Sequence, residues 1–215
     1  MNACRARKLL TLMLGITVST FGAEGRNRTQ KKATATETTA VKAFGSKAAP
    51  VTMEVFSDFQ CPACRTLYQD TLRQVMDDYV AAGKVYMIHR DYPLPAHKYA
   101  REAARYANAA ARIDRLEKVE EALYSRQPTW SVDGNIKAVV AAVLTPKEMV
   151  RVRQLLRSSQ HQLDAAIEKD VALGGNFQVR QTPTTIITHR GQTYPVVGIV
   201  SYTVLRQFLD QLLSQ

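Results

Sequence analysis

The chain has 215 residues, which is enough for one domain of ordinary size with an inserted segment. Hydrophobic residues make up 46% of it, so the composition is that of a globular protein and excludes disorder throughout. The net charge is +10, but residues 1–48 hold nine Lys and Arg against two acidic residues, and residues 49–215 hold twenty against seventeen. Because the second part has no dense basic block, the charge does not indicate nucleic-acid binding.

The chain begins with the pattern of an export signal. Arg5, Arg7 and Lys8 form a positive region, and an apolar run over residues 9–18 follows it. This run is shorter than the ~20 residues that span a bilayer, so we expect a cleaved signal peptide over residues 1–23. The mature protein is then periplasmic or otherwise extracytoplasmic, and it stays tethered to the membrane only if the leader is not cleaved.

The segment after the leader has no pattern typical of regular structure. Residues 24–48 are rich in Thr, Ala and Lys and show no apolar periodicity. We therefore expect a flexible tether over residues 24–48 and a single domain over residues 49–215.

The domain opens with a strand, a helix and a second strand. Residues 51–56 form a β-rich run, apolar residues then recur at helical spacing from Pro62 to a stop at Gly83, and residues 84–89 form another β-rich run. Two strands that are joined by a helix are expected to pair in parallel.

The middle of the domain, about residues 96–175, is almost wholly helical in pattern. Pro128 and Pro146 interrupt the Ala-rich periodic segments, and we expect Gly174 and Gly175 to end the last of them. The alternating charges of the first of these segments, around Glu117, Glu120 and Glu121, predict a helix face exposed to solvent.

Two more strands and a helix close the domain. Residues 184–188 and 193–197 predict a β-hairpin, and an amphipathic helix is expected from about Ser201. The whole order is βαβ, a helical block, and ββα, which predicts an α/β fold with an all-helical subdomain inserted into it.

The chemistry centres on Cys61-Pro62-Ala63-Cys64, which lies directly after the first strand and at the start of a helix. Unpaired N–H groups and the helix dipole stabilise a negative charge there, and the thiolate is the reactive form of cysteine. Pro62 suits the first helical position. We expect Cys61 to be the nucleophile that forms a mixed disulfide and Cys64 to resolve it.

A cysteine pair of this spacing has two other possible uses, a zinc site and a structural disulfide. A zinc site needs two further ligands, but Cys4 leaves with the leader and the histidines show no paired ligand spacing. A purely structural disulfide does not explain the position at a helix start. We therefore expect no metal and no organic cofactor. The four histidines are His89, His97, His161 and His189.

These motifs resemble the DsbA family of exported thiol–disulfide oxidoreductases. Residues 56–64 are similar to the active-site segment of that family, and residues 89–97 are similar to a segment of one of its branches. Thr182-Pro183 matches the cis-proline dipeptide, and the helical block matches the helical insertion. The resemblance covers about residues 50–215, and it implies a thioredoxin-like fold with an inserted all-helical subdomain.

The resemblance also implies a function. It implies an enzyme that introduces disulfide bonds into unfolded or cysteine-containing secreted and periplasmic proteins, with Thr182 and Pro183 binding the substrate backbone beside Cys61. A DsbB-like or equivalent membrane redox partner would regenerate the disulfide, and the protein would act as a monomer. A reductase or isomerase of the same compartment would use the same residues, and a cysteine-based metal-binding protein is the alternative from another class.

Two positions depart from the family pattern. The dipeptide Pro62-Ala63 lacks the histidine of the strongly oxidising members, which leaves the strength of oxidation open. Glu54 resembles the buried acid of the first strand, but one extra residue separates it from Cys61. It is interpreted either as the proton acceptor for Cys64 or as an acid at the strand edge that faces water.

Overall fold

The computed structural model describes residues 42–215. The predicted signal peptide and most of the predicted tether lie outside these residues. Within residues 42–215, every helix is too short or too polar to cross a membrane.

The centre of the domain is a five-stranded sheet with strand order β1-β3-β2-β4-β5. The adjacent strands β2 and β3 are parallel, as the sequence predicts, and the other three pairs are antiparallel. The central strand β2 leads directly into the cysteine motif. The strands are β1 (Ala43–Phe44), β2 (Val51–Ser57), β3 (Val85–Asp91), β4 (Thr184–His189) and β5 (Gln192–Val197).

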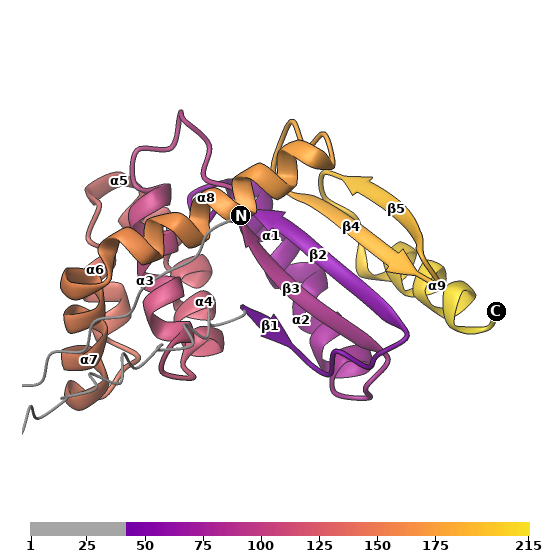
Figure 1. Ribbon diagram of the computed structural model, residues 1–215, viewed down its shortest axis with the longest axis horizontal. Coiled ribbons are helices and arrows are strands. Elements are labelled where there is room, and N and C mark those ends of the chain that lie inside the picture. The colour runs from indigo at the N-terminus through magenta and orange to yellow at the C-terminus, as the bar shows by residue number, and fades with distance from the viewer. Residues whose placement is uncertain (1–41) are drawn as a thin grey trace, which may run out of the picture. The chain divides into compact units, whose positions relative to one another are not determined.

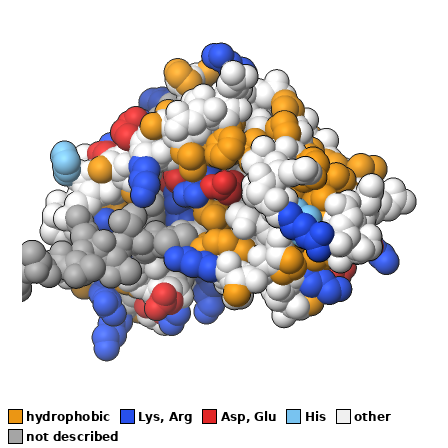
Figure 2. Space-filling view, turned by 45° about the vertical axis from the view of Figure 1, so that its right-hand side comes forward, with side chains coloured by type: hydrophobic (Ala, Val, Ile, Leu, Met, Phe, Trp, Pro, Cys, Tyr) orange, Lys and Arg blue, Asp and Glu red, His pale blue; other side chains and the backbone are white. Residues whose placement is uncertain are grey.

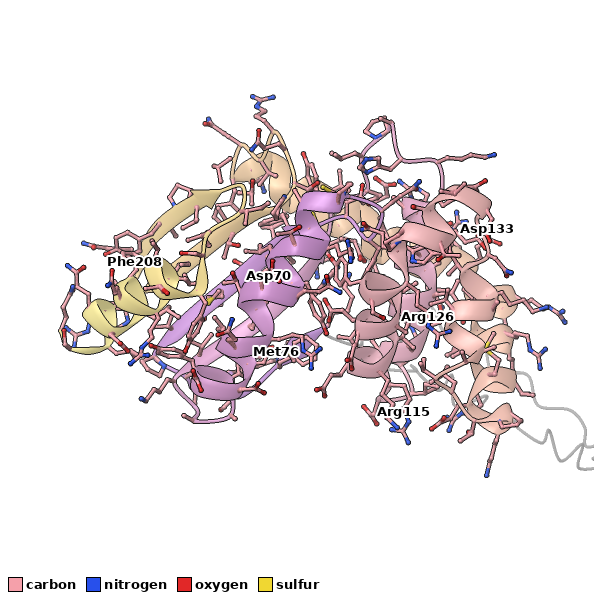
Figure 3. All side chains as sticks on the ribbon, turned by 180° about the vertical axis from the view of Figure 1, so that it is seen from behind. Asp70, Met76, Arg115, Arg126, Asp133 and Phe208 are labelled. Carbon is pink, nitrogen blue, oxygen red and sulfur yellow. The ribbon has the colours of Figure 1, made fainter. Side chains whose placement is uncertain are left out.

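A helical segment and the last helix cover one face of this sheet. The segment is continuous from α1 to η2, and two of its turns are π-helical. Its apolar side packs on β2 and β3 together with α9, which lies beside it when the domain is seen from behind (Figure 3). Its parts are α1 (Pro62–Leu67), η1 (Tyr68–Leu72), α2 (Arg73–Val75) and η2 (Met76–Val80), and α9 is Tyr202–Leu213.

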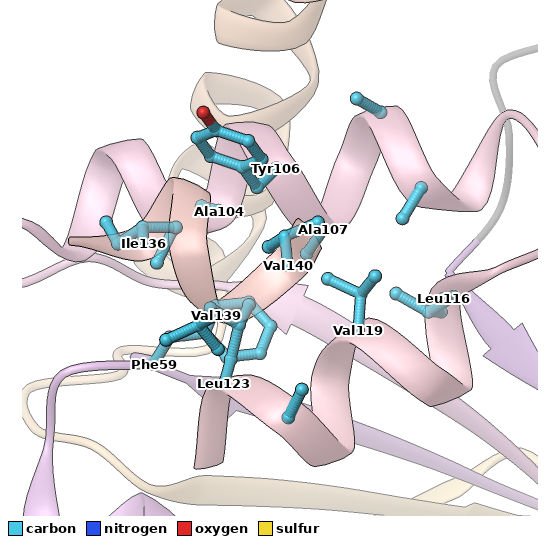
Figure 4. Packing of buried hydrophobic residues seen from close by; sticks show 14 of the residues in the cluster. Phe59, Ala104, Tyr106, Ala107, Leu116, Val119, Leu123, Ile136, Val139 and Val140 are labelled. Atoms are coloured by element: carbon cyan, nitrogen blue, oxygen red, sulfur yellow. The ribbon is translucent and has the colours of Figure 1, made fainter. Parts of the chain in front are cut away.

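The predicted helical block is confirmed as an insertion between β3 and β4, and it stands to one side of the sheet (Figure 1). The helical insertion consists of α3 (Ala100–Ala111), α4 (Leu116–Ser125), α5 (Gln127–Asp133), α6 (Ile136–Ala141), α7 (Pro146–Ser158) and α8 (Gln160–Asn176). Its apolar core includes Phe59, which precedes the cysteines and lies beside Leu123 and Val139 in Figure 4. Cys61 and Cys64 belong to the same cluster, so the core of the insertion is continuous with the redox motif.

One helix boundary differs from the prediction. The helix α8 continues through Gly174 and Gly175 to Asn176 and does not end at the glycines. A Cβ atom at position 174 would lie 2.5 Å from the ring of Tyr92. The glycine is therefore explained by the close approach of Tyr92 and not by a helix end.

The domain also begins earlier than residue 49. Residues 43 and 44 form β1, which pairs with β3, and Gly45 turns the chain with a φ of +86°. The preceding residue, Lys42, is buried and forms ion pairs with Asp91 and with Asp170, the latter at 2.8 Å. The last part of the predicted tether, residues 42–48, is therefore part of the domain. A two-residue strand and a single buried lysine have no periodicity that the sequence analysis could detect.

We expect Lys42→Ala to destabilise the domain strongly, because it leaves two buried carboxylates without their shared cation. Loss of one partner of a buried ion pair costs on the order of 3 kcal/mol, to be measured by urea unfolding. The matched control is Lys47→Ala, five residues away and exposed, which should change the free energy of unfolding by less than about 0.5 kcal/mol. Equal effects of the two substitutions would contradict the assignment of Lys42 to the folded domain.

Candidate active site

The first turn of α1 holds the cysteine pair. Cys61 is the N-cap residue, Pro62 is the first helical residue, and Cys64 lies within the first turn, as the sequence predicts. Both cysteines are present as free thiols. Cys61 is 7% exposed and Cys64 is 1% exposed, so only Cys61 lies near the surface.

Cys61 is set up as the nucleophile. A hydrogen bond from the Cys64 thiol lowers its pKa to about 5, aided by the Thr182 side chain and by the backbone N–H groups of Cys64 and Ala63, while burial acts in the opposite direction. The backbone N–H groups of the helix start therefore add to a stabilisation that comes mainly from the Cys64 thiol. At neutral pH Cys61 is a thiolate.

Cys64 has the opposite character. Burial raises the pKa of its thiol far above the usual range, and the neighbouring Cys61 raises it further. The backbone N–H of Asp58, 3.4 Å away, and the Ser57 hydroxyl act in the other direction but do not offset the burial. This difference between the two sulfurs is what the predicted roles of nucleophile and resolving cysteine require.

The fold brings the predicted cis-proline dipeptide, Thr182-Pro183, beside the cysteine motif. The Thr182–Pro183 peptide bond is cis. The carbonyl oxygen of Thr182 lies 3.5 Å from Sγ of Cys61, although 121 residues separate the two in sequence. The Gly198 N–H donates to the Pro183 carbonyl at 2.8 Å and so ties this loop to the end of β5. A backbone edge thus lies directly beside the reactive sulfur.

Glu54 is not part of this site. Side chains alternate along β2, so Glu54 and Ser57 point to opposite faces of the sheet, and Ser57 is the one that faces Cys64. The Glu54 carboxylate accepts a hydrogen bond from Nε of Arg90 at 2.9 Å, and its side chain is 13% exposed. Both sequence interpretations are therefore wrong, because Glu54 is a largely buried, ion-paired acid away from the cysteines.

The residue that holds the active-site loop against the helical insertion is not among the predicted site residues. Gln127, the first residue of α5, is buried and donates its side-chain amide to the carbonyl oxygens of Phe59 (2.7 Å) and Cys61 (3.0 Å). Nothing in the sequence around Gln127 indicates this contact, because its partners are main-chain atoms 66 and 68 residues away.

A second group outside the predicted site residues is the pair Asp58 and His97. The buried Asp58 carboxylate accepts hydrogen bonds from the N–H groups of Gln60 (2.7 Å) and Leu94 (2.8 Å). Its Oδ2 atom also lies 2.7 Å from Nδ1 of His97, which is partly buried. The carboxylate therefore fixes the loop before Cys61 to the loop after β3. The one local signal for this role of Asp58 is its position two residues before Gln60, because an Asp side chain commonly accepts a hydrogen bond from the N–H two residues further on.

The comparisons with known proteins agree with this architecture. A family model described as Thioredoxin matches residues 35–209. The chain belongs to this thioredoxin family. Among solved structures, BdbD of Bacillus subtilis is similar with a TM-score of 0.67 and 20% identity, over 82% of this chain and 94% of that one. Alpha-DsbA1 of Wolbachia pipientis is similar with a TM-score of 0.65 and 18% identity, over 80% and 90%. The fold is thus that of DsbA-like thiol–disulfide oxidoreductases, with the predicted helical insertion.

Curated relatives match over smaller shares of their length. The probable disulfide bond formation protein D of Bacillus cereus is 36% identical over 52 residues, which is 24% of each chain. The Na(+)/H(+) antiporter NhaA 3 of Salinispora tropica is 28% identical over 175 residues, which is 76% of this chain and 24% of the relative. The chain thus matches about a quarter of the length of these relatives.

The arrangement is suited to thiol–disulfide exchange. It has an ionised outer sulfur, a protonated inner sulfur one turn away, and a main-chain edge for a second chain. No group of three or more His, Cys, Asp and Glu that could hold a metal ion occurs within residues 42–215.

The thiolate of the reduced protein should titrate with a midpoint near pH 5, followed by its absorbance at 240 nm. Cys61→Ser should abolish this transition, and the oxidised protein should lack it. Cys64→Ala should move the midpoint upward, because the strongest hydrogen bond to the thiolate is then lost. A wild-type midpoint above pH 8 would contradict the assignment.

The same shift predicts how stability depends on pH. The pKa of Cys61 is lowered on folding from its ordinary value of 9.0, so the thiolate stabilises the reduced protein fully above pH 9, and this contribution is lost as the pH falls through about 5. We expect the free energy of unfolding of the reduced form, relative to the oxidised form, to rise between pH 5 and pH 9. Cys61→Ser cannot form the disulfide, and its free energy of unfolding, measured by the same urea unfolding and taken relative to the oxidised wild type, should show no such rise.

Proposed function

We propose that the protein introduces disulfide bonds into exported proteins by exchange at Cys61 and Cys64. The observation that carries the proposal is the ionised Cys61 sulfur, held within 3.5 Å of the Thr182 carbonyl in a DsbA-like fold. The predicted leader over residues 1–23 supports a location outside the cytoplasm, the periplasm in a Gram-negative cell, where disulfides persist.

The reaction begins with the Cys61–Cys64 disulfide. A substrate thiolate attacks Sγ of Cys61, the disulfide breaks, and its electron pair leaves on Cys64, which takes up a proton. A second substrate thiolate then attacks the substrate sulfur of the mixed disulfide, and Cys61 leaves as a thiolate. Two electrons pass from the substrate to the protein. One of the two substrate protons is balanced by Cys64, and the other is released.

The low pKa of Cys61 favours this direction over reduction. A thiol of low pKa is a good leaving group, and a stabilised thiolate favours the reduced form of the protein. The protein therefore gives up its disulfide readily. The alternative hypothesis, a reductase, would require a thiol pair that is less stable in its reduced form.

Substrate chains are proposed to dock against Thr182 and Pro183. Extended backbone can bind the edge beside Cys61 while apolar side chains contact the nearby surface. Hydrophobic side chains gather at the end of the domain formed by β5 and α9 (Figure 2), and the exposed ones there include Val197, Ile199 and Val204. An oxidised membrane partner would restore the disulfide, and we expect the protein to work as a monomer.

The test combines a measurement of the redox potential of the cysteine pair with a measurement of disulfide transfer. The mature protein is equilibrated in glutathione buffers, and its oxidised form is added to a reduced, unfolded protein that regains activity only with its disulfides. We expect a potential near or above about −180 mV and stoichiometric transfer of disulfides. Cys61→Ser should show no redox transition in the glutathione buffers and should transfer no disulfides. A potential near about −270 mV without transfer would make the protein a reductase instead.

A further inference from the structure

The helix α7 of the insertion carries several positive charges that are not neutralised. Its Lys and Arg residues are all exposed, and they are Lys147, Arg151, Arg153 and Arg157. No ion pair joins any of them to an acid within residues 42–215. The one acid of α7, Glu148, closes the capping box with Thr145 and pairs with Arg115, so it is engaged at the start of the helix.

The neighbouring helices show the opposite arrangement. Arg101 of α3 pairs with Glu168 of α8. Arg105 of α3 pairs with Asp164 of α8, with Nε and Oδ1 2.7 Å apart. Residues 134–163, which include α7, hold five Lys and Arg against a single acid. A helix face that is only solvated usually mixes charges of both signs, so the unbalanced charge of α7 calls for a partner of opposite sign.

The helical spacing gathers most of these charges on one side of α7. At about 100° per residue, five side chains lie within about 120° of one another around the axis. We call them the basic face of α7: Lys147, Val150, Arg151, Gln154 and Arg157. Val150 is 53% exposed although it is apolar, and it lies between the cations. Met149 and Val152, on the other side of the helix, are buried in the core of the insertion and so hold the basic face outward.

The position of α7 leaves the active site open. The helix packs mainly against α3, α6 and α8, and it lies at the end of the insertion that is away from β4 and β5 (Figure 1). Cys61 precedes α1, and Thr182 precedes β4. A partner bound to the basic face would therefore cover neither the reactive sulfur nor the backbone edge beside it.

The shape of the basic face indicates the chemistry of its partner. From Lys147 to Arg157 it extends about 15 Å along the helix axis, which is longer than a single phosphate group. The surface of an anionic membrane offers many phosphate groups side by side above an apolar layer, which matches cations that surround an exposed valine. The helix has no aromatic residue on which the bases of a single-stranded nucleic acid could stack.

We propose that the basic face of α7 docks the protein on a membrane of anionic phospholipid. Lys147, Arg151 and Arg157 bind lipid phosphates, and Val150 contacts the boundary between head groups and acyl chains. The predicted export of the chain and its proposed membrane redox partner would bring it to such a surface. The docking itself goes beyond the proposed function, because it needs no redox step at Cys61.

The test measures binding to lipid vesicles. The mature protein, residues 24–215, is sedimented with vesicles of phosphatidylglycerol and phosphatidylcholine in equal parts, or with vesicles of phosphatidylcholine alone. We expect binding to the anionic vesicles only. The binding should weaken as the salt is raised from about 0.05 M to about 0.5 M, because salt screens exposed charges.

A triple variant tests the basic face itself. Lys147→Gln, Arg151→Gln and Arg157→Gln together should weaken binding to the anionic vesicles at least about tenfold. The matched control is Lys47→Gln, Lys84→Gln and Arg190→Gln. It removes the same charge from exposed positions at the end of the sheet opposite to the cysteine motif, and it should bind as the unchanged protein does.

Both triple variants retain residues 24–41, so any contribution of the basic residues there to binding is the same in each. The titration of the Cys61 thiolate should be unchanged in both, which shows that they fold. This readout also keeps docking separate from the redox chemistry, since loss of docking with an intact thiolate leaves the proposed function untouched.

Three outcomes would overturn the docking proposal. The first is equal weakening in the two triple variants, because net charge and not the basic face would then decide binding. The second is equal binding to vesicles with and without anionic lipid, or to neither. The third is release from the vesicles by inorganic phosphate that replaces chloride at the same ionic strength, because the face would then be a site for a free anion.

Discussion

The hydrogen bond between the two cysteines is the interaction on which the rest of the site depends. A single helical turn holds both sulfurs, yet one must carry a negative charge and the other must keep its proton. The Cys64 thiol resolves this by donating to the Cys61 thiolate, and its own burial keeps it protonated. The helix start adds backbone N–H groups on the side of Cys61 only. The asymmetry is thus built from geometry and burial, without the histidine that some related proteins place between the cysteines.

The helical insertion contributes more than a cover for the active site. Gln127 binds the carbonyl oxygens of the active-site loop, Phe59 is packed into the core of the insertion, and Tyr124 reaches the Ser57 hydroxyl below Cys64. The sheet contributes His89, which meets Glu120 of the insertion in a buried pair. Such a pair is costly to bury, so it is weak evidence for stability by itself.

The elements that depend on local pattern were predicted well. The strands, the long helical block, the hairpin and the cysteine motif follow from periodicity and from Pro and Gly positions, which act over a few residues. Glu54 and Glu120 are two acids whose surroundings the local pattern did not predict. Glu54 resembles the buried acid of the family's first strand, but the alternation of β2 turns it to the face opposite Ser57. Glu120 was assigned to a solvent-exposed face, but it is buried because α4 packs that side against β3 and η1.

The sequence by itself determined the redox centre, because a Cys-x-x-Cys motif at a helix start specifies its chemistry within four residues. It also determined the fold class, through the order of strands and helices. Only the tertiary structure decided that Glu120 is buried beside His89, that Lys42 belongs to the domain, and that Gln127 and Asp58 hold the active-site loop. These outcomes depend on contacts between residues far apart in the chain. The free energy of burying a charge depends on what surrounds it in space, and a linear pattern does not record that.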